Sequence, residues 1–387
     1  MLKSRLCIAF FAFAVGCAPA QKPLTDYVNP MLGTATLWDS VDLGFKPTKR
    51  TWGAEVFPGS SLPNAMVQVS PVTKFHSGAG YQYEDSVIYG FTHTNKGHWN
   101  LCHIPLLPVT GTPTPGDYCS PFSHERESAA PGYYQVFLDR YGVDAQLSST
   151  LRCAFHKYTY PAGAAASLLA DLQRSNEHVR AWDIRKEGDN VFAGWQQTGE
   201  KMYFYAVANR PVTGIEPVVE GDREVRIVRF GEGDGALELR IGFSFVSEKN
   251  ARENLEAEML GKSFAEVRSE ATATWNDLLG RIRVEGGTER EKGLFYSSLY
   301  RSFLWPALRS DVNGEFTDVD GKVINPGFRY YTGPSYWDDY RNKLILLGML
   351  APDVAADVIS SDVDKGEKRG GFMPTFFHGD HASAFVA

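Results

Sequence analysis

The sequence predicts a multidomain β plus α protein, in which an N-terminal β-sandwich is followed by a helical linker and then by a helical domain. Three observations lead to this class. The length of 387 residues suggests two or three domains. Short segments of alternating polarity fill roughly the first two thirds of the chain. Helical periodicity replaces them near residue 250.

Residues 1–20 predict a secretory signal peptide. Lys3 and Arg5 precede an apolar run that ends at Val15, and such a run is too short to cross a bilayer. Two processing routes stay open, namely cleavage after residue 20 and a lipoprotein signal that ends before Cys17. We therefore expect an exported bacterial protein that is periplasmic, secreted or an outer-membrane lipoprotein. A lipid on Cys17 would be its only attachment to a membrane.

Residues 21–250 predict the β-sandwich domain. Turns rich in Gly, Pro, Asn and Asp separate the alternating segments, and no long helical period intervenes. Many short strands of this kind favour a sandwich over a parallel sheet. The clearest segments are AMVQVSP at 65–71, YYQVFL at 133–138, HKYTYP at 156–161, KMYFYAVAN at 201–209, REVRIVRF at 223–230 and LELRIGFSFV at 237–246.

Residues 251–287 predict the helical linker, because apolar residues recur there at helical spacing. These residues are Phe264, Val267, Ala271, Trp275, Leu278, Leu279 and Ile282. Residues 288–387 predict the opening of the helical domain. A helix near 289–308 is apolar on nearly every face and is expected to be buried. Another helical stretch begins near residue 336, and we expect Pro352 to divide it.

Charge and cysteine content narrow the possible partners. A net charge of -7 without a basic run argues against nucleic acid and against an anionic membrane surface. Three cysteines follow the signal region. A disulfide, with Cys102 and Cys119 as the nearest pair, and buried free thiols both stay open.

The segment SYWDDYR at 335–341 is a candidate sugar-binding site. Trp337 offers a ring that can stack on the apolar face of a sugar, while Asp338 and Arg341 can hydrogen-bond to its hydroxyls. Acidic residues in a first helical turn are also ordinary complements of the helix dipole. Both readings stay open at this point.

The segment GFTHTNKGHWNLCHIP at 90–105 is a candidate binding loop. It gathers His93, His98, Trp99, Asn100 and His103. The histidine spacing fits neither a helical face nor a zinc finger, so a zinc site is not indicated. His98 and Trp99 are the residues that we expect to contact a ligand.

Two acidic segments lie further along the chain. In FFHGDHA at 376–382, Asp380 has imidazoles on both sides, and a catalytic acid, a metal site and a turn all stay open. In SDVNGEFTDVDG at 310–321, the acidic residues are out of register with an EF-hand loop. A pair of turns or a hairpin is expected there instead.

Taken together, several blocks of this sequence resemble glycoside hydrolase family 92, the calcium-dependent exo-α-mannosidases. No single block is decisive, but their order and spacing along the chain are specific. The blocks are DYVNPMLGT at 26–34, FPGSSLPNAMVQVSP at 57–71 with 80–111, FAEVRSEATATWNDLLGRIRVEGG and FYSSLYRSFLWP within 264–306, and YTGPSYWDDYRNKLILLGMLAPD at 331–353, running into GGFMP.

The resemblance implies a fold and an activity. The fold is a β-sandwich, a helical linker and an (α/α)6 toroid, of which residues 288–387 form the beginning. The activity is inverting hydrolysis of terminal α-linked mannose in mannose-containing glycans, assisted by Ca2+. The active site is expected between the two domains, with Trp99, Trp337 and Asp338 as walls of the mannose pocket.

Two departures from the family pattern bear on activity. Where many members carry a general-acid Glu in a G-N-E-T segment, this chain has Gly379-Asp380-His381-Ala382. Asp380, or His381 as the alternative at that position, is therefore the candidate general acid. Family members are also about twice as long, so we expect the catalytic base and the calcium ligands in a C-terminal half that this sequence does not contain.

The leading hypothesis is therefore a truncated mannoside hydrolase, inactive as this fragment. One alternative is a phosphomannosidase-type activity of the full-length protein on mannose-1-phosphate diesters, because such a leaving group needs little protonation. The other alternative is a glycan-binding β-sandwich protein without catalytic activity.

Overall fold

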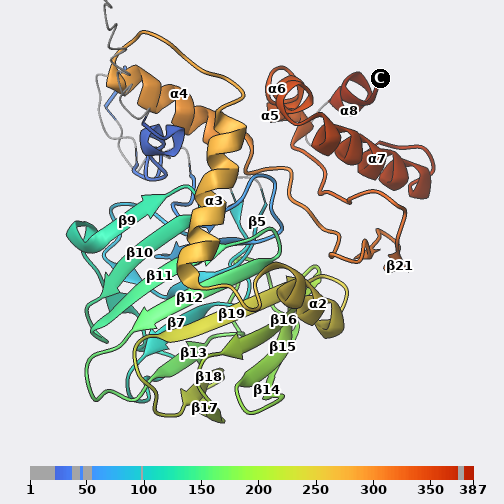
Figure 1. Ribbon diagram of the computed structural model, residues 1–387. Helices are drawn as coiled ribbons and strands as arrows, with labels where there is room; N and C mark the ends of the chain where they lie inside the picture. The colour runs from blue at the N-terminus through green and yellow to red at the C-terminus, as the bar shows by residue number, and fades with distance from the viewer. Residues whose placement is uncertain (1–21, 37–43, 47–54, 97–98, 374–378) are drawn as a thin grey trace, which may run out of the picture.

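The computed structural model describes residues 22–36, 44–46, 55–96, 99–373 and 379–387. A large β domain comes first, and the chain then continues through helices to the C-terminus (Figure 1). This arrangement confirms the predicted β plus α class. The predicted signal at residues 1–20, with Cys17, lies outside the described residues.

Two antiparallel sheets form the β domain. The seven-stranded sheet has the order β1 (Ser60–Ser61), β2 (Gln68–Val72), β4 (Gly90–Thr92), β7 (Leu106–Val109), β13 (Ser167–Ala170), β18 (Arg223–Phe230) and β17 (Val212–Glu220). The eight-stranded sheet has the order β14 (Ala181–Lys186), β15 (Val191–Gln197), β16 (Lys201–Ala208), β19 (Leu237–Ser244), β12 (Cys153–Thr159), β11 (Val143–Ser149), β10 (Tyr133–Leu138) and β9 (Glu127–Ala130).

The alternation seen in the sequence places one face of each strand in the core. In β16, Met202, Phe204 and Ala206 are buried, while Tyr203 and Tyr205 between them are partly exposed. One hydrophobic cluster joins the inner faces of both sheets. It includes Val69, Leu168 and Ile227 from the first sheet and Leu147, Phe204 and Ile241 from the second. The predicted strands therefore form a sandwich, as expected.

Short elements decorate the sandwich. They are the 3-10 helices η1 (Leu24–Tyr27) and η2 (His124–Arg126), and the two-stranded pairs of β3 (Val87–Ile88) with β8 (Ser120–Pro121) and of β5 (Asn95–Lys96) with β6 (Trp99–Asn100). The three cysteines that follow the signal region are free, and Cys102 and Cys153 are buried. The possible Cys102–Cys119 disulfide is not formed.

Two helices cover the outer face of the eight-stranded sheet (Figure 1). The helix α2 (Glu248–Glu258) packs on β19 and β16, and α3 (Phe264–Leu279) packs on β11 and β12. Ser263 and Glu266 form a capping box that starts α3. Trp275 is fully buried, and its indole Nε1 donates to the carbonyl of Ser61 over 2.7 Å. The linker is thus fastened to the sandwich along its length.

The helix α4 (Glu289–Ser302) differs from its prediction. It is buried only at Tyr296, Ser297, Leu299 and Tyr300. Leu294 and Phe295 are 45% and 36% exposed. The expectation of a buried helix is therefore wrong for much of its surface, because α4 packs by one face against α3 and η1 and directs its charged first turn to solvent.

The remaining elements follow the sequence closely. The strands β20 (Phe316–Thr317) and β21 (Val323–Ile324) pair as a hairpin. This confirms the prediction that the turn-rich segment forms turns or a hairpin and not an EF-hand loop. The last helices are α5 (Tyr336–Asp339), α6 (Lys343–Leu350), α7 (Pro352–Lys368) and α8 (His381–Val386). Pro352 stands at the first position of α7, as predicted.

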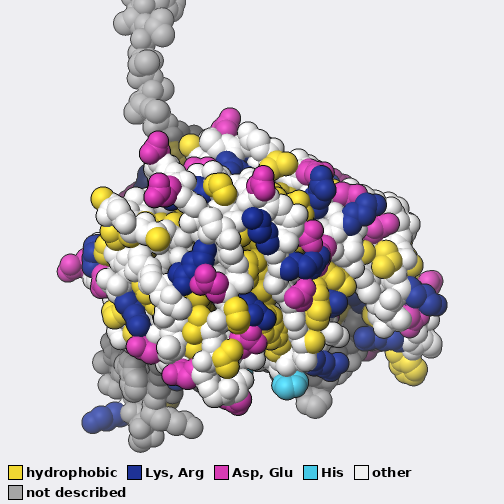
Figure 2. Space-filling view, turned by 90° about the horizontal axis from the view of Figure 1, so that it is seen from below, with side chains coloured by type: hydrophobic (Ala, Val, Ile, Leu, Met, Phe, Trp, Pro, Cys, Tyr) yellow, Lys and Arg dark blue, Asp and Glu magenta, His cyan; other side chains and the backbone are white. Residues whose placement is uncertain are grey.

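The surface is mixed in character. On the face shown in Figure 2, acidic and basic side chains alternate, so neither sign of charge dominates that face. Among the described residues, no helix combines the length and the apolarity that crossing a bilayer requires.

A buried polar network joins the β domain to the segment that leads into the later helices. The carboxylate of Asp311, which is 2% exposed, accepts hydrogen bonds from Ser244, Asn250 and Asn254 over 2.6 to 2.9 Å. The guanidinium of Arg152 donates to the carbonyl of Ser310 over 2.8 Å. Because these groups come from β19, α2 and the turn between β11 and β12, they fix the position of residues 310–311 on the sandwich.

Candidate functional site

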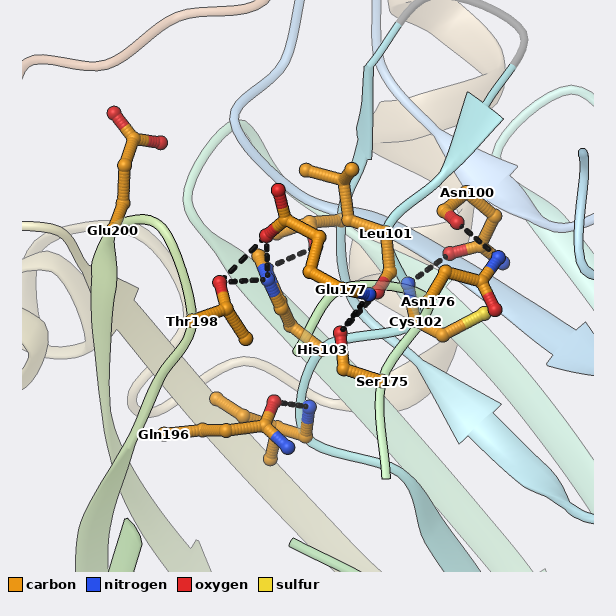
Figure 3. Close-up of polar contacts among 12 residues, drawn as sticks. Asn100, Leu101, Cys102, His103, Ser175, Asn176, Glu177, Gln196, Thr198 and Glu200 are labelled. Atoms are coloured by element: carbon orange, nitrogen blue, oxygen red, sulfur yellow. Dashed lines mark hydrogen bonds and ion pairs between the residues drawn. The ribbon is translucent and has the colours of Figure 1, made fainter. Parts of the chain in front are cut away.

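A strained segment lies at the heart of the candidate site. Cys102 and Ile104 both have a φ of 53°, a left-handed conformation that is unfavourable for a β-branched residue such as Ile104. Side chains hold the backbone in this shape (Figure 3). The Cys102 amide donates to Asn100 Oδ1 over 2.7 Å, and the Ile104 amide donates to Gln196 Oε1 over 2.8 Å. The strain is thus maintained by buried amide side chains.

His103 stands between the two strained residues and is buried. Its Nε2 lies 3.0 Å from Glu177 Oε2 and 3.0 Å from Thr198 Oγ1, and its Nδ1 lies 2.8 Å from Thr94 Oγ1. Thr198 Oγ1 also donates to Glu177 Oε2 over 2.6 Å. The imidazole Nε2–H and the threonine hydroxyl therefore point at the same carboxylate oxygen (Figure 3).

Glu177 is held from its backbone side as well. Its amide donates to Ser175 Oγ over 3.1 Å, and the Ser175 hydroxyl donates to the carbonyl of Leu101 over 2.6 Å. Asn176 Nδ2 donates to the carbonyl of Asn100 over 2.6 Å. The Glu177 side chain is 38% exposed. The result is a carboxylate in fixed orientation that faces solvent, which suits recognition of hydroxyl groups.

Sequence reasoning named His103 as part of a loop but missed Glu177 and Thr198. Glu177 comes from the segment after β13, and Thr198 comes from the turn between β15 and β16. Neither residue belongs to a motif, and only the pairing of distant strands brings them to His103. The positive φ at Ile104 has no signal in the sequence either, because β-branched residues normally avoid that conformation.

His93, which the sequence grouped with this loop, has a structural role. It is fully buried, and its Nε2 lies 3.0 Å from Nε2 of His156. Its ring packs against Phe243, with 4.6 Å between the ring centroids. Burial lowers the pKa of His93 to about 3, and burial also lowers the pKa of His156 well below its usual value. Both histidines are therefore neutral members of the core.

A second cluster forms where α5 meets α8. The His381 ring stacks on Tyr340 at 4.0 Å between centroids, and Trp337 lies 5.7 Å from His381. Arg341 Nε donates to the Tyr340 hydroxyl over 2.8 Å. Trp337 is 47% exposed. The structure therefore brings together three of the predicted residues, Trp337, Arg341 and His381, in an aromatic cluster that reaches the surface.

Asp338 and Asp380 each serve a helix start in the structure. Asp338 Oδ2 accepts from Ser335 Oγ over 2.6 Å, and Asp380 Oδ2 accepts from Ser383 Oγ over 2.7 Å. Both side chains are exposed. The neighbouring Asp339 is buried and paired with Lys343 over 3.2 Å, and burial raises the pKa of its carboxyl. The ligand-binding role of Asp338 and the acid role of Asp380 stay predictions.

The predicted binding loop is only partly described. His98 lies outside the described residues. Trp99 belongs to β6, and its side chain also lies outside the description. Their predicted contacts with a ligand therefore stay predictions.

The predicted role of Ca2+ is not tested by the structure and stays a prediction. Within residues 22–36, 44–46, 55–96, 99–373 and 379–387, no group of three His, Cys, Asp or Glu side chains is placed to hold a metal ion. Hard cations such as Ca2+ need several oxygen ligands. No catalytic step is therefore assigned to Ca2+ here.

Two surface cavities in the described part of the chain lie away from both clusters. One of about 510 Å³ is bordered by Arg240, Lys262 and Glu266, and one of about 630 Å³ by Lys157, Phe264 and Arg268. Both flank α3 on the outer face of the eight-stranded sheet. Neither is lined by the residues around His103, namely Thr94, Glu177 and Thr198, or by Trp337, Tyr340 and His381.

An oriented, solvent-facing carboxylate on the β-sandwich and the half-exposed Trp337 on the following helices are features that suit carbohydrate binding. The chain belongs to glycosyl hydrolase family 92. The model of the family's N-terminal domain matches residues 27–253, and the model of its catalytic domain matches residues 250–385.

Solved structures show the same architecture. A family 92 α-mannosidase from Bacteroides thetaiotaomicron is 26% identical, with a TM-score of 0.82 over 91% of this chain and 51% of that protein. The same mannosidase has also been solved in complex with mannoimidazole. An inverting mannosidase from Bacteroides thetaiotaomicron VPI-5482, 24% identical over 94% of this chain and 52% of that protein, shares the fold with a TM-score of 0.80.

A curated relative comes from a fungus. An uncharacterized secreted glycosidase of Arthroderma benhamiae is 24% identical in an alignment that covers 75% of this chain and 42% of that protein. The chain thus spans about half the length of the relatives that it matches.

Proposed function

We propose that this chain is part of an exported glycoside hydrolase that removes terminal α-linked mannose from mannose-containing glycans. The observation that carries the proposal is its likeness to a family 92 α-mannosidase, which extends over 91% of the chain at 26% identity and includes both domains. That mannosidase also forms a complex with mannoimidazole. A mannose-like ligand is therefore the natural first probe.

The two clusters support sugar binding by complementary chemistry. Glu177, oriented by His103 and Thr198, can accept hydrogen bonds from hydroxyl groups. Trp337 exposes an aromatic surface of the kind that packs against the apolar face of a sugar ring. Arg341 lies beside it and can donate to ring substituents. We propose Trp337, Asp338 and Arg341, with His98 and Trp99, as substrate-binding residues.

The proposed chemistry is inversion. It needs one carboxylic acid that protonates the leaving oxygen and one carboxylate that activates water from the opposite side. Asp380 is the proposed acid, with His381 as the alternative. To act in this way, Asp380 must exchange its bond to the Ser383 hydroxyl for one to the glycosidic oxygen.

We further propose that Ca2+ assists the reaction, as the family resemblance implies, and that the 387-residue chain alone binds mannosides without hydrolysing them. Export through residues 1–20 is part of the proposal, and the secreted fungal relative supports it. A lipid on Cys17 is the proposed membrane attachment.

The test measures binding and turnover side by side. The chain is titrated calorimetrically with α-1,2-mannobiose and with a methyl diester of mannose 1-phosphate, and mannose release is followed by chromatography with and without Ca2+. Binding of mannobiose without release supports the proposal. Release of mannose from mannobiose would overturn only the inactivity of this chain. Release from the phosphodiester alone would replace the proposed substrate, and absence of any mannoside binding would reject the proposed function.

A further inference from the structure

The buried guanidinium of Arg309 lies near Glu200 without a full set of hydrogen-bond partners. Arg309 follows α4, and its amide donates to the carbonyl of Tyr330 over 2.7 Å. Its guanidinium carbon lies 4.1 Å from the centroid of the Phe245 ring. The residue is only 8% exposed. Backbone pairing and ring packing therefore fix the position of this charge.

The hydrogen bonding of Arg309 is incomplete. Nη2 lies 3.5 Å from Glu200 Oε2, which is the far limit for a hydrogen bond. Nη1 is buried, and no group in the described part of the chain accepts from it. A buried donor without a partner destabilises the folded protein, and more so when it is charged. Native proteins keep such donors where a ligand or water completes them.

The charged groups around Arg309 limit which ligand groups can accept a hydrogen bond from its Nη1. Glu200 is 61% exposed on the turn between β15 and β16, two residues from Thr198 (Figure 3). Glu177 is oriented by the same Thr198. Burial lowers the pKa of Arg309, whereas the charges of Glu200 and Glu177 raise it. Glu200 thus contacts Arg309, and Glu177 is joined to the same turn through Thr198, so two carboxylates accompany one guanidinium in this region.

We propose that Arg309, Glu177 and Glu200 form a hydroxyl-binding site for a neutral sugar unit. The site lies between the β domain, which supplies both carboxylates, and the segment after α4, which supplies the guanidinium. The inference deepens the proposed function, on which it rests, by assigning a neutral glycan and not a phosphodiester to this site.

Hydrogen-bond chemistry favours a sugar hydroxyl at this position. A hydroxyl can accept from Arg309 Nη1 and donate to a carboxylate at the same time. A phosphate group offers only acceptors, so it could satisfy Arg309 but would meet two like charges. The same reasoning disfavours carboxylated sugars.

The test compares two charge-matched variants by calorimetry on the full chain with α-1,2-mannobiose. Glu200→Gln removes the carboxylate beside Arg309. Glu216→Gln is the control, because Glu216 is similarly exposed at 55% and is paired with Arg229 over 3.0 Å elsewhere on the sandwich. We expect E200Q to weaken binding about 5-fold or more, which corresponds to roughly 1 kcal/mol for one hydrogen bond to a charged group, and E216Q to leave it unchanged.

Arg309→Met keeps an unbranched side chain over Phe245 and removes the donor. We expect it to weaken mannobiose binding about 10-fold or more. If thermal unfolding shows that R309M is not folded, Glu177→Gln carries the test, because it keeps the shape of the side chain and its bond to the Thr198 hydroxyl. Unchanged affinity in the folded variants overturns the site. Tighter binding of the mannose 1-phosphate diester than of mannobiose overturns its preference for neutral sugars.

A panel of neutral disaccharides separates this inference from the proposed function. If the wild-type chain binds maltose or a galactobiose but no mannoside, and R309M or E177Q abolishes that binding, the mannose assignment fails while the hydroxyl site stands. If the wild-type chain binds no neutral sugar of the panel, the hydroxyl site is rejected.

Discussion

At the scale of single residues, the position of the Glu177 carboxylate depends on hydrogen bonds that also hold the strained backbone at Ile104. Gln196 makes the central bonds. It is fully buried, its Oε1 accepts from the Ile104 amide, and its Nε2 donates to the carbonyls of Leu172 and Arg174 over 2.9 Å. The Gln196 side chain thus connects the backbone next to His103 with residues 172–174, which follow β13 and precede Glu177.

Gln196→Leu is expected to destabilise the protein by roughly 2–4 kcal/mol, because it leaves the amide of Ile104 buried without an acceptor and frees a strained residue. The measurement is urea unfolding followed by fluorescence. Gln197→Leu, at the neighbouring and partly exposed position, is the control and is expected to change stability by less than about 0.5 kcal/mol. Equal effects of the two substitutions would contradict the supporting role of Gln196.

The His93–His156 pair predicts how stability changes with pH. Both histidines are neutral in the folded protein because burial lowers their pKa, to about 3 for His93. In the unfolded chain their pKa is ordinary, near 6.5, so the unfolded state binds more protons below that pH. The contribution of this pair to the free energy of unfolding is therefore fully present well above pH 6.5 and is lost on acidification, by roughly 1 kcal/mol per histidine at pH 5.5.

Unfolding free energies between pH 8 and pH 5 check this sign. Burial raises the pKa of Asp311 and Asp339, and such carboxyls make the folded protein more stable as the pH falls, opposite to the histidines. The informative quantity is therefore the difference in pH dependence between wild type and a histidine variant. His93→Leu should remove about half of the histidine-dependent slope relative to wild type. A slope that is unchanged in this variant would show that His93 is not the group that titrates.

At the scale of elements, the docking of α3 on the sandwich depends on one close approach. Gly132 lies in the turn before β10 with a φ of 78°, and a Cβ built there would lie 2.5 Å from the Cβ of Ala271 in α3. The spacing of apolar residues predicted this helix correctly. The need for small residues on both sides of the contact arises only from the packing of α3 on β11 and β12.

Gly132→Ala is expected to destabilise the protein by about 2–4 kcal/mol, from left-handed strain and from the clash with Ala271. Gly163→Ala is the matched control, because Gly163 has a φ of 75° and no atom within 4 Å of its built Cβ. The Gly163→Ala variant should be destabilised only by the left-handed backbone strain, which is about 1–2 kcal/mol. Chemical denaturation of both variants gives the comparison, and an equal loss would mean that α3 moves away without cost.

At the scale of the whole molecule, the network around Asp311 connects the sandwich to the chain that continues into the later helices. Asp311→Ala leaves three buried donors without their acceptor, from Ser244, Asn250 and Asn254. We expect a loss of about 3–5 kcal/mol and faster hydrogen exchange in α2 and in residues 310–331. Asp320→Ala, on the exposed turn of the β20–β21 hairpin, is the control. Uniform exchange changes across the sandwich would contradict a local connecting role.

The later helices are expected to be less protected than the sandwich. Ile345, Met349 and Phe372 are 58%, 72% and 78% exposed, whereas the strands share a continuous buried core. Contiguous exposed apolar surface and few buried contacts favour local opening. Hydrogen exchange should therefore be faster in α5–α8 than in β10–β12. Equal protection of the two regions would reject this expectation.

The sequence alone determined the elements of this protein and its family. Alternating polarity located strands such as β10 and β18 almost to the residue, and helical spacing together with Pro352 located α3 and the start of α7, because these signals are local in the chain. Family blocks pointed to Trp337, Arg341 and His381, which the structure brings together.

Only the tertiary structure decided how Glu177, Thr198, Glu200 and Arg309 relate to His103. These four residues come from three separate segments, carry no motif, and are brought together by strand pairing and by the course of the chain after α4. The left-handed backbone at Ile104 and the solvent-facing half of α4 were equally beyond prediction. Both depend on the segments that pack against them in the folded protein, and the neighbouring sequence does not reveal those contacts.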